Sequence, residues 1–376
     1  MQVEKNKEYI VDIIDNGFQG EGIAKIDGLT IFIPKAIKGE KIKVLIVKVL
    51  TSHAFGKIIE IINPSENRVE SECTTYKRCG GCSLRHVKYT LKMKQNAVQS
   101  LVNKSLNNKI KVEETLGMEH PYHYRNKAQY PVGLNKDGKP VIGVFANRTH
   151  EIIPIDTCFI QNKQTEEIAK YIFKFLVDNN VSFYDEKAQK GLVRHIVTKI
   201  GIKTNEIMCI IVINGREIPN ESKMISELTS KFSSIKTIVK NINTKNTNVI
   251  LGNENINLYG DGYITDKLGD YTFKISPMSF YQVNPIQAER LYELGVKFAD
   301  ITKEDVVFDL YCGIGTISLF MSKFAKKVYG VEIVDEAIIA AKENARINNV
   351  YNTEFIAGDV EKVLDNLVNV KQIIPD

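Results

Sequence analysis

Short alternating runs of apolar and polar residues fill the first part of the chain. They lie between residues 7 and 62, where turns such as Gly20-Glu21-Gly22 and Asp27-Gly28 separate them. Five short strands at regular spacing with glycine-containing turns are typical of a small closed barrel of the OB type. Such barrels bind single-stranded nucleic acid through basic and aromatic surface residues. We therefore expect an N-terminal, OB-like β-barrel.

The pattern becomes more varied in the middle of the chain. Residues 88–106 carry a helical stripe of apolar positions, and further helical patterns cover Gln164–Asn179 and Ser222–Phe232. Many strands joined by short turns predict a mostly antiparallel α+β domain. The expected strands are Ala128–Val132, Val141–Phe145, Leu192–Ile200, Ile207–Ile213, Ile235–Ile242, Asn248–Leu251, Asn255–Leu258 and Tyr271–Ile275.

The last hundred residues alternate strands and helices in the order of an open α/β sheet. A helix over Ile286–Ala299 precedes a strand over residues 306–310. Further strands are expected at Lys327–Val331, which leads into Glu332, and at Thr353–Ala357. Strands that alternate with helices in this way predict a parallel, Rossmann-like sheet.

The turn after the first of these strands is a candidate ligand-binding loop. It reads Asp309-Leu310-Tyr311-Cys312-Gly313-Ile314-Gly315-Thr316. Glycine lets the backbone approach a ligand closely, and ligands of open α/β sheets bind at the carboxyl ends of the strands. Glu332 and Gly358-Asp359, which follow the next two strands, could therefore join the site, with Glu332 accepting hydrogen bonds from a ribose diol. Ser318 stands where a dinucleotide motif has its third glycine, so S-adenosylmethionine fits better. The alternative is a tight turn that binds no ligand.

Length and composition are those of an ordinary globular protein. The 376 residues, 43% hydrophobic and 25% charged, give room for two or three domains. The sequence has no run of 18 apolar residues and no signal-peptide core, so we expect a cytoplasmic protein without membrane contact. In that compartment, six cysteines are more often thiols or metal ligands than disulfides.

The net charge of +5 is concentrated in one segment. Residues 71–125 hold ten lysines and arginines against four acidic residues, whereas basic and acidic residues cancel over residues 1–70. A basic segment of this kind suits a polyanion such as nucleic acid. A solvated helix face is the alternative explanation.

Four of the cysteines have a spacing that suggests a metal site. Three of them form the pattern Cys73-x5-Cys79-x2-Cys82, with Gly80-Gly81 inside the tight pair, and Cys158 is the candidate fourth ligand. Four sulfurs fit a [4Fe–4S] cluster or a structural zinc ion. The three-plus-one arrangement favours iron, because zinc sites more often use two C-x2-C pairs. Buried free thiols are the remaining alternative.

Polar and aromatic residues gather at three places outside the glycine loop. Two lie in the central region, at Tyr122–Lys127 and Gly191–His195, where arginine and aromatic side chains suit phosphate contacts and base stacking. Surface loops with satisfied polar groups explain these two equally well. The third, Ser276–Pro285, carries the amides of Gln282 and Asn284, which could bind a cofactor or the edge of a base.

Together these features resemble the RNA (uracil-5-)-methyltransferase family, in its iron–sulfur branch that modifies 23S rRNA. The resemblance covers nearly the whole chain. The matching features are a TRAM-like N-terminal barrel, the cysteine pattern with its distant Cys158, Tyr124-Arg125-Asn126-Lys127, Ser279-Phe280-Tyr281-Gln282-Val283-Asn284, the loop Asp309–Thr316, and Glu332.

The resemblance implies a three-part architecture. An RNA-binding TRAM barrel would span residues 1–62, a central α+β domain with the iron–sulfur site and RNA contacts residues 63–275, and a Rossmann-like methyltransferase domain residues 276–376. It further implies a monomer when full length, whose RNA partner is 23S rRNA, because the related tRNA branch generally lacks the TRAM domain and the cluster.

The resemblance also assigns residues to two ligands. Cys73, Cys79, Cys82 and Cys158 would hold a [4Fe–4S] cluster. Gln282, Tyr311 and Glu332 would contact S-adenosylmethionine. Together with the loop residues considered above, we therefore predict a cofactor site made of Gln282, Tyr311, Gly313, Gly315, Glu332 and Asp359.

The chain departs from this family after its third predicted α/β strand. The family continues with a fourth strand, an Asp-Pro-Pro loop, a nucleophilic cysteine and a basic glutamate, and none of these has a counterpart before Ile373-Ile374-Pro375-Asp376. We therefore expect a C-terminally truncated chain whose sheet has an apolar open edge, and we assign no catalytic residue. Cys312 lies in the cofactor loop and is not expected to be the nucleophile. A catalytically inactive iron–sulfur RNA-binding protein is the alternative function.

Overall fold

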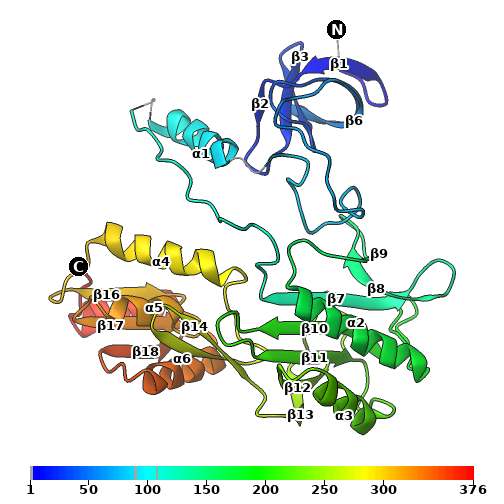
Figure 1. Ribbon diagram of the computed structural model, residues 1–376. Coiled ribbons are helices and arrows are strands. Elements are labelled where there is room, and N and C mark those ends of the chain that lie inside the picture. Colours follow the sequence, from blue (N-terminus) through cyan, green and yellow to red (C-terminus); the bar gives the residue numbers. More distant parts are fainter. Residues whose placement is uncertain (1–2, 89–90, 107–108) are drawn as a thin grey trace. The chain divides into compact units, whose positions relative to one another are not determined.

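The computed structural model describes residues 3–88, 91–106 and 109–376, and the chain forms two compact units (Figure 1). The N-terminal unit comprises Met1–His120 together with Phe145–His150. The C-terminal unit comprises Pro121–Val144 and Glu151–Asp376. Among the described residues, no helix is long and apolar enough to cross a lipid bilayer.

The N-terminal unit begins with the predicted barrel, built from six strands rather than five. The sheet has the order β1-β5-β6-β4-β3-β2. A hydrogen bond from the Ile14 N–H to the Ile23 carbonyl (2.9 Å) continues the pairing of β2 with β3, and β1 also lies in contact with β3. Its core contains the fully buried Ile31, Ile33 and Ile42. The strands are β1 (Glu8–Asp12), β2 (Asp15–Asn16), β3 (Gly22–Ile26), β4 (Leu29–Ile33), β5 (Lys41–Val49) and β6 (His53–Asn63).

A buried ion pair fastens the barrel to the segment that follows it. The Glu40 carboxylate accepts hydrogen bonds from Nε and Nη2 of Arg68 at 2.5 and 2.8 Å. It also accepts the backbone N–H groups of Ile37 (2.8 Å) and Ser65 (3.3 Å). Burial alone would raise the pKa of Glu40, but the hydrogen bonds from Arg68 and from the backbone outweigh it and hold that pKa below its ordinary value.

One helix follows the cysteine-rich segment of the N-terminal unit. Helix α1 (Leu91–Leu106) corresponds to the helix predicted over residues 88–106, of which residues 89 and 90 lie outside the described residues. The side chains of Gln95 and Gln99 donate to the carbonyls of Val112 and Ile110, both at 2.8 Å. The chain therefore returns alongside α1 after the helix ends.

The C-terminal unit contains a seven-stranded sheet of order β13-β12-β11-β10-β7-β8-β9. Its described pairings are antiparallel apart from the parallel pair β11–β12, which agrees with the predicted mostly antiparallel α+β domain. Its elements are β7 (Lys127–Leu134), β8 (Pro140–Phe145), β9 (Ile152–Pro154), α2 (Lys163–Asp178), β10 (Val193–Ile200), β11 (Ile207–Ile213), α3 (Glu221–Lys231), β12 (Ile235–Ile242) and β13 (Glu254–Tyr259).

The central strands of this sheet are buried on both faces. Every residue of β10 and β11 is buried, which explains the continuous apolar sequence of β11, whereas β10 also buries the polar side chains of Arg194, His195, Thr198 and Lys199. One face, with Ile196 and Ile211, packs against helices α2 and α3. The other face, with Val197 and Ile210, packs in a second core that also contains residues of the last hundred positions. The sheet is thus the platform on which the rest of the unit is built.

One predicted strand of the central region is wrong, and two strands were missed. Asn248–Leu251 forms a loop, because the Asn243 side chain donates to the carbonyls of Val249 (2.8 Å) and Ile250 (3.0 Å) and so replaces the hydrogen bonds of a strand partner. The missed strands are β9 and β14 (Ile264–Leu268), and β14 pairs antiparallel with the predicted β15 (Tyr271–Ile275).

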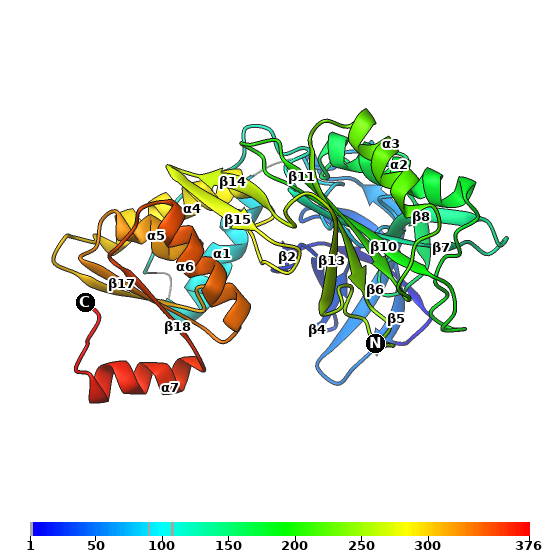
Figure 2. The ribbon, with the colours of Figure 1, turned by 90° about the horizontal axis from the view of Figure 1, so that it is seen from below.

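The last part of the unit is the predicted parallel α/β sheet, of order β16-β17-β18. Figure 2 shows α5 and α6 together beside the strands, and α7 apart from them. Two hydrogen bonds join the edge strand β16 to Asp376. The Asp376 N–H donates to the Val306 carbonyl (3.1 Å), and the Val306 N–H donates to the Asp376 carboxylate (2.8 Å). The elements are α4 (Pro285–Ala299), β16 (Val306–Leu310), α5 (Thr316–Ser322), β17 (Lys327–Glu332), α6 (Asp335–Ile347), β18 (Thr353–Ala357), α7 (Val360–Asp365) and a π-helical turn (Asn366–Val370).

Candidate functional site

The glycine loop follows β16 and is fastened to the neighbouring strand. The N–H groups of Tyr311 and Cys312 both donate to the Val331 carbonyl, at 2.8 and 3.0 Å. Tyr311, Gly313 and Gly315 all adopt left-handed backbone conformations, with φ of 69°, 54° and 81°. A tyrosine in this region is strained, and such strain is common where a chain is shaped for a ligand.

The Glu332 carboxylate is fixed at the carboxyl end of β17. One oxygen accepts the Gly313 N–H at 3.2 Å, and the other accepts the Val334 N–H at 3.0 Å. The Glu332 carbonyl accepts the Gly358 N–H at 3.0 Å, which joins the ends of β17 and β18. Each carboxylate oxygen can accept a further hydrogen bond. The carboxylate is therefore held in one orientation with capacity left for the two hydroxyls of a ribose.

Gln282 reaches the same part of the unit from the loop before α4. Its side chain hydrogen-bonds the Tyr292 hydroxyl, which also lies 3.3 Å from Oγ1 of Thr316 at the start of α5. Burial raises the pKa of Tyr292, and the hydrogen bonds to Thr316 and Gln282 act in the opposite direction. Tyr292 thus connects Gln282 to the end of the glycine loop. The sequence analysis did not identify Thr316 or Tyr292 as site residues.

Three exposed apolar side chains lie beside Glu332 and the loop. Tyr311 is 72% exposed, and Ile333 and Val334 are 64% and 48% exposed. Because these residues follow the ends of adjacent strands, they offer an apolar surface on which a purine base could pack. Together with Glu332 this surface suits a nucleoside.

Asp359 stands at the carboxyl end of β18 but has a local partner. Its Oδ1 accepts the Lys362 N–H at 3.2 Å and caps α7, while the side chain remains exposed. The capping bond explains why an acid follows this strand in the sequence. A ligand contact for Asp359 stays a prediction.

Cys312 is unsuited to nucleophilic chemistry. Its thiol is buried, and burial, followed by the charges of Asp309 and Glu332, raises its pKa to about 12. Because the thiolate is the nucleophilic form of cysteine, a thiol with this pKa is unreactive at neutral pH. Asp309 is also buried and accepts a hydrogen bond from the Ser318 hydroxyl at 2.5 Å, so both residues serve the interior of the loop.

The two glycines of the loop meet different surroundings. A β-carbon on Gly315 would lie 2.9 Å from Cζ of Phe355 and 3.3 Å from Cβ of Ala341, whereas a β-carbon on Gly313 would meet nothing within 4 Å. The same phenylalanine ring would lie 2.5 Å from a β-carbon on Gly330. Gly315 is therefore required by packing, and Gly313 borders open space where a ligand could approach.

We expect Gly315→Ala to lower the free energy of unfolding by about 1–3 kcal/mol more than Gly313→Ala does. Both substitutions force a positive φ on alanine, but only the first crowds Phe355. Urea denaturation of the two variants followed by circular dichroism measures the difference. Equal losses would show that Phe355 and Ala341 move aside without cost.

The four cysteines proposed as metal ligands fall in both units. Cys73, Cys79 and Cys82 belong to the N-terminal unit, and Cys158 belongs to the C-terminal unit. All four are partly buried, and Sγ of Cys79 accepts the Gly81 N–H at 3.2 Å, an interaction that favours an anionic sulfur. Within the described part of the chain, however, no group of three or more Cys, His, Asp or Glu side chains is placed to hold a metal ion. The structure thus does not support the predicted cluster.

The predicted RNA-binding segment at Tyr122–Lys127 lies against the residues that follow Cys158. The His123 and Arg125 N–H groups donate to the carbonyls of Phe159 (2.9 Å) and Ile160 (3.0 Å). The side chain of Tyr122 is half exposed. At its other end, Asn126 donates from its backbone to the Val283 carbonyl (3.1 Å) and from its amide to the Gln282 carbonyl (2.9 Å). This segment therefore borders the loop that carries Gln282.

The second predicted RNA-binding segment, Gly191–His195, is a wrong prediction. Arg194 and His195 are buried, with 5% and 7% exposure. The Arg194 guanidinium lies over the Tyr184 ring and donates to three backbone carbonyls of a single loop, so it has no access to a phosphate. The carbonyls are those of Asn243 (2.8 Å), Lys245 (2.7 Å) and Thr247 (3.3 Å).

Comparison with known sequences finds relatives along nearly the whole chain. Residues 86–373 match the family model described as tRNA (uracil-5-)-methyltransferase, and residues 2–59 match the TRAM domain model. An RNA methyltransferase of Clostridium acetobutylicum is 47% identical, over 100% of this chain and 82% of its own length. One from Staphylococcus aureus is 42% identical, over 96% of this chain and 81% of its own length.

Comparison with solved structures points to the same fold. The crystal structure of Pyrococcus abyssi tRNA (uracil-54, C5)-methyltransferase in complex with S-adenosyl-L-homocysteine superposes with a TM-score of 0.72 and 23% sequence identity. The superposition covers 93% of this chain and 79% of the archaeal one. These findings confirm the predicted TRAM domain and the mixed α/β methyltransferase fold.

Proposed function

The chain belongs to the tRNA (uracil-5-)-methyltransferase family, and on that premise we propose that it binds S-adenosylmethionine and directs its methyl group to C5 of a uridine in RNA. The relatives from C. acetobutylicum and S. aureus are named RNA methyltransferases, and the archaeal structural neighbour was crystallised with the demethylated cofactor. The proposal places this chemistry in the cytoplasm, on a monomer.

The observation that carries the proposal is the position of Glu332. Its carboxylate is oriented by the N–H groups of Gly313 and Val334 at the carboxyl end of β17. A carboxylate in this place suits the two ribose hydroxyls of an adenosyl group. Tyr311 would pack on the cofactor, and Gln282 would reach it from beside Tyr292. Gly313, Gly315 and Asp359 complete the proposed site.

Uracil C5 is too weak a nucleophile to accept a methyl group unaided. In the proposed reaction a cysteine thiolate adds to C6, and the resulting enolate attacks the sulfonium methyl group through C5. A general base then removes the C5 proton, and the thiolate leaves with restoration of the C5–C6 double bond. We assign neither the nucleophile nor the base to a residue among positions 1–376. A target base within folded RNA would first have to turn out of its stack.

We propose 23S rRNA as the substrate, because the chain carries a TRAM domain together with the cysteine pattern. The test uses ³H-methyl S-adenosylmethionine and separated rRNA and tRNA from a strain that lacks this gene. Label at C5 of uridine in the 23S fraction supports the proposal, and label in tRNA would reassign the substrate. Salt-dependent RNA binding without any label would favour the non-catalytic alternative.

We also propose that Cys73, Cys79, Cys82 and Cys158 hold a [4Fe–4S] cluster. The support is the cysteine spacing and the N–H donated to the Cys79 sulfur. The reaction above has no redox step, so we assign the cluster a structural role. The same resemblance leads us to propose domain boundaries near residues 62 and 275.

Anaerobically purified protein is expected to be brown and to contain about four irons per chain. Cys79→Ser should remove the colour and make the protein more sensitive to limited proteolysis, because a metal site that contributes to folding is lost. Cys209→Ser is the matched control, since Cys209 is a buried thiol within β11. Stoichiometric zinc in the wild type, or a brown Cys79→Ser variant, would refute the cluster or its ligand set.

A further inference from the structure

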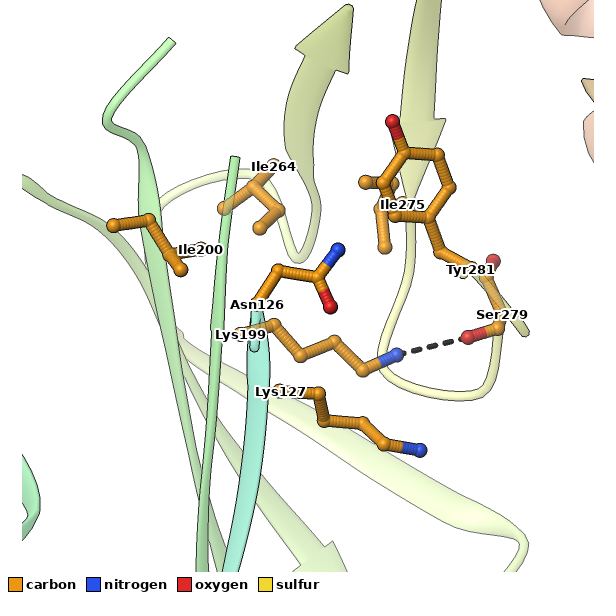
Figure 3. Close-up of a pocket in the computed structure, with 8 residues that line it drawn as sticks. All are labelled: Asn126, Lys127, Lys199, Ile200, Ile264, Ile275, Ser279 and Tyr281. Atoms are coloured by element: carbon orange, nitrogen blue, oxygen red, sulfur yellow. Dashed lines mark hydrogen bonds between the residues drawn. The ribbon is translucent and has the colours of Figure 1, made fainter. Parts of the chain in front are cut away.

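Lys199, in β10, places a charged side chain inside the C-terminal unit. The residue is 5% exposed, and its Nζ donates to the carbonyls of Ser276 (2.9 Å), Pro277 (2.9 Å) and Ser279 (3.0 Å). Figure 3 shows the lysine reaching across a small cavity to the Ser279 carbonyl. An ammonium has three N–H donors, so the three carbonyls satisfy all of them.

Burying the Lys199 ammonium has a desolvation cost that the fold alone does not require. Burial, and to a smaller extent the charge of the neighbouring Lys127, lower the pKa of Lys199 to about 7. The cavity around the side chain is otherwise partly apolar, with Ile200, Ile264 and Ile275 in its wall. An apolar side chain of the same length would pack there without the desolvation cost. We therefore explain the Lys199 ammonium by its hydrogen bonds to the three carbonyls, which fix their orientation.

Those carbonyls belong to the loop that carries Gln282, and other residues hold the rest of that loop. Asn126 binds the carbonyls of Gln282 and Val283. The hydroxyl of the buried Tyr281 donates to the Asp266 carboxylate at 3.3 Å. The side chain of Asn284 caps α4 by accepting the Gln287 N–H at 3.2 Å. Lys199 holds the N-terminal end of this loop, where the chain leaves β15 and continues toward Gln282.

We propose that Lys199 is a positioning residue for the methyl donor. Its ammonium turns the carbonyls of residues 276, 277 and 279 inward, and this turn directs Gln282 toward Tyr292. The inference rests on the proposed function, because it assumes that Gln282 contacts S-adenosylmethionine. It adds that the central sheet, through β10 and the neighbouring Asn126, sets the shape of the cofactor site.

The test replaces Lys199 with methionine, which keeps the length of the side chain and removes the donors. We expect the dissociation constant of S-adenosylhomocysteine, measured by isothermal titration calorimetry, to rise by at least about tenfold. Hydrogen exchange of residues 276–284 should become faster.

Lys240→Met is the matched control. Lys240 is also a buried lysine of the same sheet, but its Nζ bonds to the Glu221 carboxylate at the start of α3, at 2.7 Å. Its loss should lower the thermal stability of the protein and leave the affinity for S-adenosylhomocysteine within about twofold of the wild type. An affinity loss in both variants would mean that any destabilised sheet weakens the site, which would overturn the inference.

Asn126→Asp provides a second test if Lys199→Met does not fold. It keeps the size of the side chain and removes the donor to the Gln282 carbonyl, so it should also weaken binding of S-adenosylhomocysteine. If wild-type protein binds S-adenosylhomocysteine and both loop variants bind it equally well, the positioning role is wrong and the proposed function stands. If the wild type does not bind it, the proposed function itself fails.

Discussion

Glu332→Gln will weaken the binding of S-adenosylhomocysteine by about 10- to 100-fold, because hydrogen bonds to a charged group contribute about 1.5–3 kcal/mol. Both carboxylate oxygens accept backbone N–H groups of the loop region. An amide can replace only one of these oxygens as an acceptor, and its NH2 group would face an N–H donor or a ribose hydroxyl. The substitution thus disturbs the orientation of the side chain and removes an acceptor for the ribose hydroxyls.

Glu336→Gln is the control for this variant. Glu336 is an exposed acid in the first turn of α6, four positions further along the chain. Its amide variant should bind S-adenosylhomocysteine as the wild type does. Isothermal titration calorimetry of the three proteins distinguishes a specific ribose contact from a general effect of local charge. If Glu332→Gln bound S-adenosylhomocysteine as tightly as the wild type, Glu332 would not bind the ribose and the proposed function would lose its main support.

Glu40→Gln will cost the N-terminal barrel about 3–5 kcal/mol of stability, because breaking a buried ion pair leaves its partner without compensation. The partner is Arg68, whose Nη2 also donates to the Lys35 carbonyl at 2.7 Å. A glutamine cannot balance the guanidinium charge. Glu60→Gln in β6, at an exposed position, should change the free energy of unfolding by less than about 0.5 kcal/mol.

The same carboxylate gives the barrel a defined dependence on pH. The pKa of Glu40 in the folded protein lies below its ordinary value of 4.5, since the bonds from Arg68 and the backbone outweigh the effect of burial. Its stabilising contribution is therefore complete above pH 4.5 and is lost as the pH falls through the folded-state pKa. Denaturation curves between pH 3 and 7 should show this loss in the wild type. The Glu40→Gln variant should not show this loss of stability at low pH. If the stability of both proteins changed with pH in the same way, Glu40 would not be the group responsible.

Sequence patterns predicted best the strands that are buried throughout and the strands that alternate with helices. β10 and β11 are buried throughout, and the parallel strands β16 to β18 carry short apolar runs between helices. Local patterns failed where a side chain from a distant element decided the outcome. The backbone of Asn248–Leu251 has a strand-like sequence, but the Asn243 amide takes up its carbonyls.

The candidate site was predictable where one short segment carries the signal. Gly313, Gly315 and Glu332 belong to a strand–turn–helix–strand sequence whose geometry follows from local rules, and the structure links Gly313 directly to Glu332. Lys199 gives no such signal, and Asn126 was predicted only as part of an RNA-binding segment, because their partners in the loop before α4 lie about 80 and 156 positions away in the sequence. The buried state of Arg194 likewise depends on a loop about 50 positions further on. Contacts of this length arise only from the packed fold.

The packing around Phe355 also identifies a substitution that should make the protein temperature-sensitive in a living cell. Gly330 lies in the extended β17, so alanine at this position suffers only from crowding, at 2.5 Å from the ring and 3.0 Å from the Cys312 sulfur. A substitution that only crowds a core lowers the melting temperature while leaving the folded form intact when cold. Gly330→Ala is therefore a route to a temperature-sensitive allele. Phe355→Leu, which makes room for the new methyl group, is the expected suppressor within the same gene.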